Sequence, residues 1–69
     1  MNCREFLALY NSFSGGYRHA HYDRKFISKS KEIIKNIMKV EGISREDAAI
    51  KLIIMCKKNN CGEVDKYYV

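Results

Sequence analysis

The most constraining feature of this 69-residue chain is the stretch that follows Gly42. Ser44 has a side chain suited to capping a helix N-terminus, and acidic residues follow it in what would be the first turn. Over residues 48–56 only one side chain is polar. The pattern predicts a helix over about 44–58, and a helix that is apolar nearly all round must be buried on most of its sides.

Apolar residues near the start of the chain recur at the spacing of one helix face, i, i+3, i+4 and i+7. They are Phe6, Leu9, Tyr10 and Phe13. The glycine pair at 15–16 then disfavours further helix, because glycine loses the most backbone freedom on becoming helical. The sequence therefore predicts a helix over about 2–13.

Another helix is predicted over about 29–41, with a serine at 28 or 30 as its N-cap. Its expected buried face consists of isoleucines and one methionine. These are Ile27, Ile33, Ile34, Ile37 and Met38. Segment 17–27 is rich in aromatic and basic residues, and a weak alternation within it favours a short strand at about 21–27. A loop or an irregular helix is equally compatible with this composition.

These elements define a single domain over 1–69 of the mainly α class, with three helices. A domain of this size buries only about 60% of the surface of its unfolded chain. Because two short helices cover the apolar third helix incompletely, we expect a homodimer. No apolar run approaches the roughly 20 residues that span a membrane. Three cysteines, an odd number, indicate a reducing compartment, so we expect a cytoplasmic protein without membrane contact.

The net charge of +5 is concentrated in one part of the chain. Residues 15–39 carry seven bases against two acids. Lys31, Lys35 and Lys39 stand four apart on the expected solvent side, where like charges repel and cost helix stability. Such a cluster is typical of a site for a polyanion, although a solvated surface that keeps the protein soluble explains it too. The candidate nucleic-acid-binding residues are Arg18, His21, Arg24, Lys25, Lys29, Lys31, Lys35, Lys39, Ser44 and Arg45.

Neither catalysis nor a cofactor is expected. A nucleophile and base would have to be assembled from Cys3 or Cys61 with His19 or His21, and nothing in the sequence places them together. No glycine-rich phosphate loop precedes a helix. The spacing of the same histidines and of Cys56 with Cys61 does not match recognised structural zinc sites. We therefore expect a binding protein without bound metal.

Residues 22–58 resemble the ribbon-helix-helix repressors, in which an apolar helix ends in Gly-x-Ser-Arg and a buried helix follows. Gly42-Ile43-Ser44-Arg45 has this form. The resemblance implies a strand before the first helix that pairs with its twin across a dimer and enters the major groove. It further implies that His21, Asp23 and Lys25 face the groove, and that Gly42, Ser44 and Arg45 approach the DNA backbone.

The charge pattern and the resemblance together predict a small basic nucleic-acid-binding protein, with DNA favoured. Its most specific form is a dimeric transcriptional repressor that reads DNA through the basic segment 17–39. Within 17–26, aromatic and basic side chains also suit stacking on exposed bases. The alternative is a protein-interaction module, such as a small inhibitor or adaptor among phage or plasmid accessory proteins, that binds an acidic protein surface.

Overall fold

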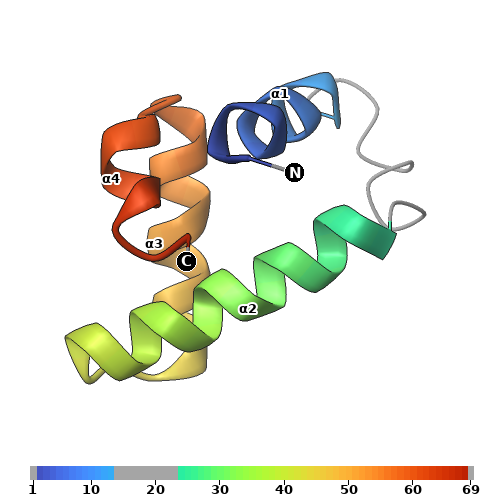
Figure 1. The fold of residues 1–69 in the computed structure, drawn as a ribbon. Helices are drawn as coiled ribbons and strands as arrows, with labels where there is room; N and C mark the ends of the chain where they lie inside the picture. Colours follow the sequence, from blue (N-terminus) through green and yellow to red (C-terminus); the bar gives the residue numbers. More distant parts are fainter. Residues whose placement is uncertain (1, 14–23, 69) are drawn as a thin grey trace.

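The computed structural model describes residues 2–13 and 24–68, the side chain of Phe13 excepted, and these residues form four helices (Figure 1). The helices are α1 (Cys3–Phe13), α2 (Arg24–Glu41), α3 (Arg45–Lys57) and α4 (Cys61–Asp65). Over these ranges the chain contains no strand, so the predicted mainly helical class is confirmed for the described residues. Helices α2 and α3 form a hairpin, and α1 packs against α3 and α4 near the far end of α3.

Helix α1 matches its predicted range to within one residue. The side-chain oxygen of Asn2 accepts a hydrogen bond from the backbone N–H of Glu5 at 2.8 Å, so Asn2 caps the helix. Phe6 and Leu7 are buried, whereas Leu9 and Tyr10 are only partly covered.

Helix α2 begins five residues before its predicted start at 29. The strand expected at 21–27 is therefore wrong for residues 24–27, which are helical, while residues 21–23 lie outside the described residues. Lys25, expected on a ribbon, stands on a helix. Packing explains the difference, because the helical spacing puts Phe26 on the core face, where its ring stacks on Phe6 with centroids 4.7 Å apart.

The predicted N-cap of α2 is also wrong. Ser28 and Ser30 both lie inside the helix. The hydroxyl of Ser30 donates a hydrogen bond to the carbonyl oxygen of Phe26, one turn earlier, at 2.8 Å. This is how a serine satisfies its hydroxyl in the middle of a helix rather than at its start.

The turn between α2 and α3 has the predicted form. Gly42 adopts a φ of 65°, in the left-handed region that glycine enters at little cost, and its N–H donates to Met38. The hydroxyl of Ser44 then accepts a hydrogen bond from the N–H of Asp47 at 3.2 Å, so Ser44 is the N-cap of α3.

Asn59 and Asn60 form the turn at which α3 ends and α4 begins. Asn59 has a φ of 54°, and its N–H donates to Cys56 while that of Asn60 donates to Met55, the pattern of a Schellman motif. The side chain of Asn60 accepts from the N–H of Glu63 at 3.2 Å and caps α4. The C-terminal segment thus begins with a fourth helix, which is absent from the three predicted from the sequence.

The core lies between the four helices and is drawn from all of them. Its buried members are Cys3, Phe6, Leu7, Ile33, Ile37, Ala48, Leu52, Met55, Cys56, Val64 and Tyr67. The segment after α4 returns to α2, where the side-chain amide of Asn36 donates to the carbonyl oxygen of Tyr67 at 2.8 Å. This hydrogen bond joins the end of the chain to the middle of the longest helix (Figure 1).

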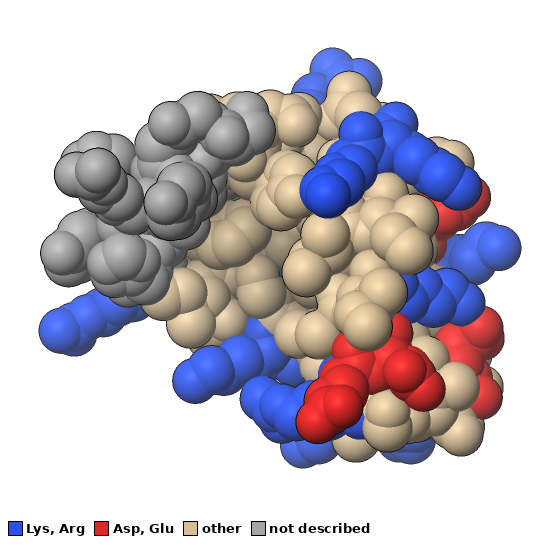
Figure 2. Space-filling model, turned by 180° about the vertical axis from the view of Figure 1, so that it is seen from behind, with Lys and Arg blue, Asp and Glu red and all other residues tan. Residues whose placement is uncertain are grey.

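Helix α3 is buried on one side only. Ile50, Ile53 and Ile54 remain 56%, 45% and 47% exposed, so the other helices cover α3 only in part. Figure 2 shows an uncharged surface on the back of the molecule, with acidic side chains below it and basic side chains above it. Neither α1, α2 nor α4 packs over these three isoleucines closely enough to bury them.

Candidate nucleic-acid interface

A row of cations runs along the outer side of α2, opposite the buried Ile33 and Ile37. We call it the α2 basic face, and it consists of Arg24, Lys31, Lys35 and Lys39, all exposed. The three lysines follow one another at about 6 Å along the helix axis, given a rise of 1.5 Å per residue. With Arg24 the row extends over about 22 Å.

Both carboxylates of α2 are engaged by lysines outside this row. Glu32 pairs with Lys29 at 3.4 Å, and Glu41 accepts a hydrogen bond from Lys51 of α3. Within the described part of the chain, no lysine of the α2 basic face forms an ion pair. The positive charge of the row is therefore not neutralised by the acids of its own helix.

Lys29 was also predicted as a nucleic-acid contact, but its ammonium is held by contacts within the protein. Its ammonium lies 4.1 Å from the centroid of the Tyr68 ring and pairs with Glu32, and its side chain is only 19% exposed. A cation held over an aromatic ring and beside a carboxylate is partly neutralised. We therefore assign Lys29 to anchoring the C-terminal segment rather than to the α2 basic face.

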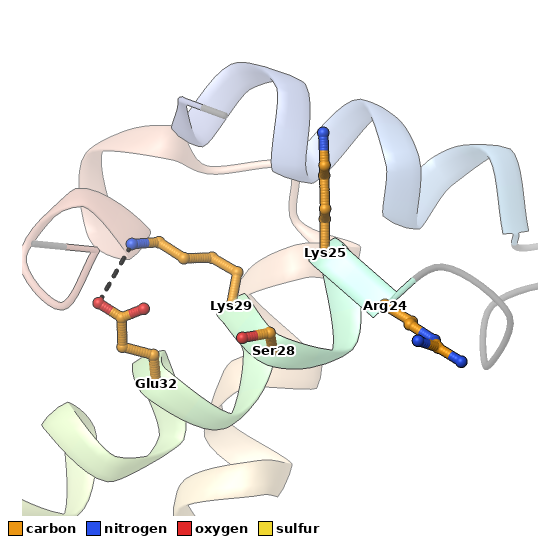
Figure 3. Close-up of a pocket in the computed structure, with 5 residues that line it drawn as sticks. All are labelled: Arg24, Lys25, Ser28, Lys29 and Glu32. Atoms are coloured by element: carbon orange, nitrogen blue, oxygen red, sulfur yellow. Dashed lines mark hydrogen bonds and ion pairs between the residues drawn. The ribbon is translucent and has the colours of Figure 1, made fainter.

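An open hollow of about 470 Å³ lies at the start of α2 (Figure 3). It is lined by Arg24, Lys25, Ser28, Lys29 and Glu32. Lys25 and Lys29 extend on one side of the helix, and Arg24 points away toward the helix start. Hydroxyl and ammonium donors around one hollow suit a phosphate group. Sequence reasoning missed Ser28 as a site residue, although its spacing of four from Arg24 was a usable signal.

The remaining predicted residues are not gathered with this row. Ser44 and Arg45 lie beyond the C-terminal end of α2, and the hydroxyl of Ser44 is used in capping α3. Arg45 is exposed in the first turn of that helix. Arg18 and His21 lie outside the described residues, as does most of the aromatic and basic segment 17–26. Among the described residues, the candidate site therefore consists of side chains of α2 alone.

The two buried cysteine thiols, those of Cys3 and Cys56, are poorly suited to nucleophilic chemistry. Burial, with smaller contributions from Cys61 and Asp65, raises the pKa of Cys3 from 9.0 to about 12. Burial raises the pKa of Cys56 to about 11. A buried thiol that stays protonated at neutral pH is a weak nucleophile and a weak metal ligand. Among residues 2–13 and 24–68, no group of three or more histidine, cysteine or acidic side chains is placed to hold a metal ion.

Comparison with known protein families, with curated proteins and with solved structures found no match to this chain. In the described residues, every helix is too short or too polar to span a bilayer.

Proposed function

We propose that this protein binds nucleic acid, preferably duplex DNA, through the α2 basic face. The observation that carries the proposal is the alignment of four exposed cations on one helix whose two carboxylates are paired elsewhere. A DNA strand presents one phosphate about every 3.4 Å along its axis. Cations repeating at about 6 Å on a helix can therefore meet several phosphates of one backbone.

The hollow at the start of α2 supports the same proposal. Lys25 carries charge to it, and the hydroxyl of Ser28 can donate to a phosphate oxygen. A contact of this kind fixes the position of a duplex along the helix, whereas the lysine row supplies attraction. The finer form of the proposal is a dimeric transcriptional repressor in the cytoplasm. The odd number of cysteines in the sequence supports a reducing compartment.

The test is fluorescence anisotropy with a labelled 20-base-pair duplex over a range of salt concentrations. Each phosphate contact contributes about 0.9 to the slope of log affinity against log salt. The double substitution Lys31→Gln with Lys35→Gln should therefore lower that slope by about 1.8. Arg4→Gln with Lys66→Gln removes the same charge from exposed positions outside α2 and should change the slope much less.

Equal losses in the two double variants would show that net charge alone governs binding, which contradicts a role for the α2 basic face. A wild-type protein that ignores duplex DNA even at low salt would contradict nucleic-acid binding. That result would favour the alternative in which the same lysines meet an acidic protein surface.

A further inference from the structure

The exposed isoleucines of α3 form a continuous stripe. Ile50, Ile53 and Ile54 stand at i, i+3 and i+4, so their side chains are neighbours on one side of the helix. Each is about half exposed, and none belongs to the core cluster on the opposite side of α3. We call this stripe the α3 apolar face. A contiguous apolar patch of this kind is typical of a surface that another molecule covers.

Charged residues of opposite sign stand at the two ends of this face. Glu46 and Asp47 lie in the first turn of α3, and Lys57 and Lys58 lie at its end, all of them exposed. Within the described residues none of the four forms an ion pair. Figure 2 shows uncharged surface between acidic side chains below and basic side chains above.

The pattern is balanced about Leu52. The two acids precede Leu52 by five and six residues, and the two lysines follow it by five and six. Ile50 and Ile54 each lie two residues from the same point. A two-fold axis that crosses the exposed side of α3 at the level of residue 52 would therefore set the acids of one copy against the lysines of another at both ends, with isoleucines in contact between them.

We propose that the α3 apolar face is the interface of a homodimer in which two α3 helices pack antiparallel about this axis. A parallel pair would place like charges together at both ends, which is unfavourable. The antiparallel pair gives partners to four charges that form no ion pair among the described residues, and it covers the exposed isoleucines. The inference does not depend on nucleic-acid binding, since no residue of the α2 basic face takes part.

The first test is sedimentation equilibrium of the full chain without nucleic acid. The wild type should dimerise, and Glu46→Lys with Asp47→Lys should raise the dimer dissociation constant at least tenfold. Lys57→Glu with Lys58→Glu should do the same. A 1:1 mixture of the two variants should dimerise about as well as the wild type, because each interface end again joins unlike charges. The chain carrying all four changes has the wild-type net charge and should also recover.

The second test concerns the apolar contact. Ile50→Asp with Ile54→Asp should leave a monomer at concentrations where the wild type is dimeric. Val40→Asp is the matched control, because Val40 is 65% exposed on α2, outside the α3 apolar face, and its change should leave the dimer intact. Circular dichroism shows whether each variant is folded. If the aspartate pair prevents folding, the 1:1 mixture of the two charge-reversal variants tests whether this face forms the interface.

Two results would overturn the proposal. One is a wild-type chain that remains monomeric throughout the accessible concentration range. The other is a dimer whose dissociation constant is unaffected by either charge reversal, because such a dimer must use a different surface or a parallel arrangement.

Discussion

Lys51 of α3 donates a hydrogen bond to the carboxylate of Glu41, the last residue of α2, and thereby ties the two arms of the helical hairpin together beyond their glycine turn. The same ammonium lies 5.6 Å from the centroid of the Tyr67 ring. One side chain thus connects α2, α3 and the segment after α4. Because these groups are exposed to solvent, their contribution to stability is best observed through its dependence on pH.

The first prediction concerns that dependence. The hydrogen bond from Lys51 lowers the pKa of Glu41 below 4.5, and the same bond raises the pKa of Lys51 above 10.5. The stabilisation is therefore present above pH 4.5 and is lost as the pH falls through the lowered pKa of Glu41. It is also lost as the pH rises through the raised pKa of Lys51. Glu41→Gln should be less stable than the wild type at pH 7 and nearly equal to it at pH 2–3.

Urea denaturation at several pH values measures this difference. Lys35→Gln is the control, because Lys35 is exposed and forms no ion pair in the described structure. A difference between Glu41→Gln and wild type that stays constant from pH 7 to pH 2–3 would contradict the proposed pair.

The second prediction concerns Gly42. Its φ of 65° is costly for any residue with a side chain, yet a Cβ placed there would meet no heavy atom within 4 Å. Gly42→Ala should therefore destabilise the protein by about 1–2 kcal/mol through backbone strain alone. Gly42→Asn should cost less, because asparagine tolerates this conformation better. Chemical denaturation compares the two, and an alanine variant as stable as the wild type would show that the turn relaxes to another conformation.

The third prediction concerns the ring of Phe6, which is fully buried. It stacks on Phe26 with an interplanar angle of 13° and meets the edge of the Tyr68 ring at a centroid distance of 6.1 Å. Phe6→Ala should cost about 3–5 kcal/mol, a large part of the stability of so small a domain. Val40→Ala, at an exposed position, should change stability by less than about 0.5 kcal/mol. Thermal unfolding followed by circular dichroism separates them, and similar melting temperatures would refute the stacking between α1 and α2.

The fourth prediction concerns thiol reactivity. Because burial raises the pKa of Cys3 to about 12 and that of Cys56 to about 11, both remain protonated at pH 7.5 and should react slowly with iodoacetamide. Cys61 is only partly buried and should be alkylated first. Peptide mapping by mass spectrometry gives the order of modification. Rapid alkylation of Cys56 in the folded protein would show that its helix opens readily.

Local signals were sufficient to predict α1 and α3. The capping serine, the acids of the first turn and the glycine before them all act within a few residues of one another, so sequence alone locates the start of α3. The early start of α2 depends on a ring of α1 that receives Phe26, a contact between residues 20 positions apart. The pattern of residues within 21–27 does not indicate that contact.

The short helix α4 could not be predicted from the sequence, for a different reason. Five residues are too few to display a helical period, and the cap formed by Asn60 becomes recognisable only when the Schellman motif has placed that residue. Helix α3, in contrast, was recognised from its apolar residues, but its exposed side was not. Their sequence shows a helix that is apolar on most sides, but only the packing of α1, α2 and α4 determines which side remains uncovered.

The spacing of Lys31, Lys35 and Lys39 was enough to predict the main part of the candidate site, because residues four apart share a helix face. The sequence also predicted Lys29 as a contact, and nothing near Lys29 in the sequence indicates that its ammonium is held by the fold instead. Its aromatic neighbour, Tyr68, lies 39 positions later in the chain, and only the folded structure brings the two together.

Asn60 serves two helices at once, since its backbone N–H closes α3 and its side chain opens α4. The last turn of α3 and the first turn of α4 therefore cannot open independently of each other. In native-state hydrogen exchange, the amides of these two turns should respond to denaturant as one cooperative unit, with a common free energy of opening.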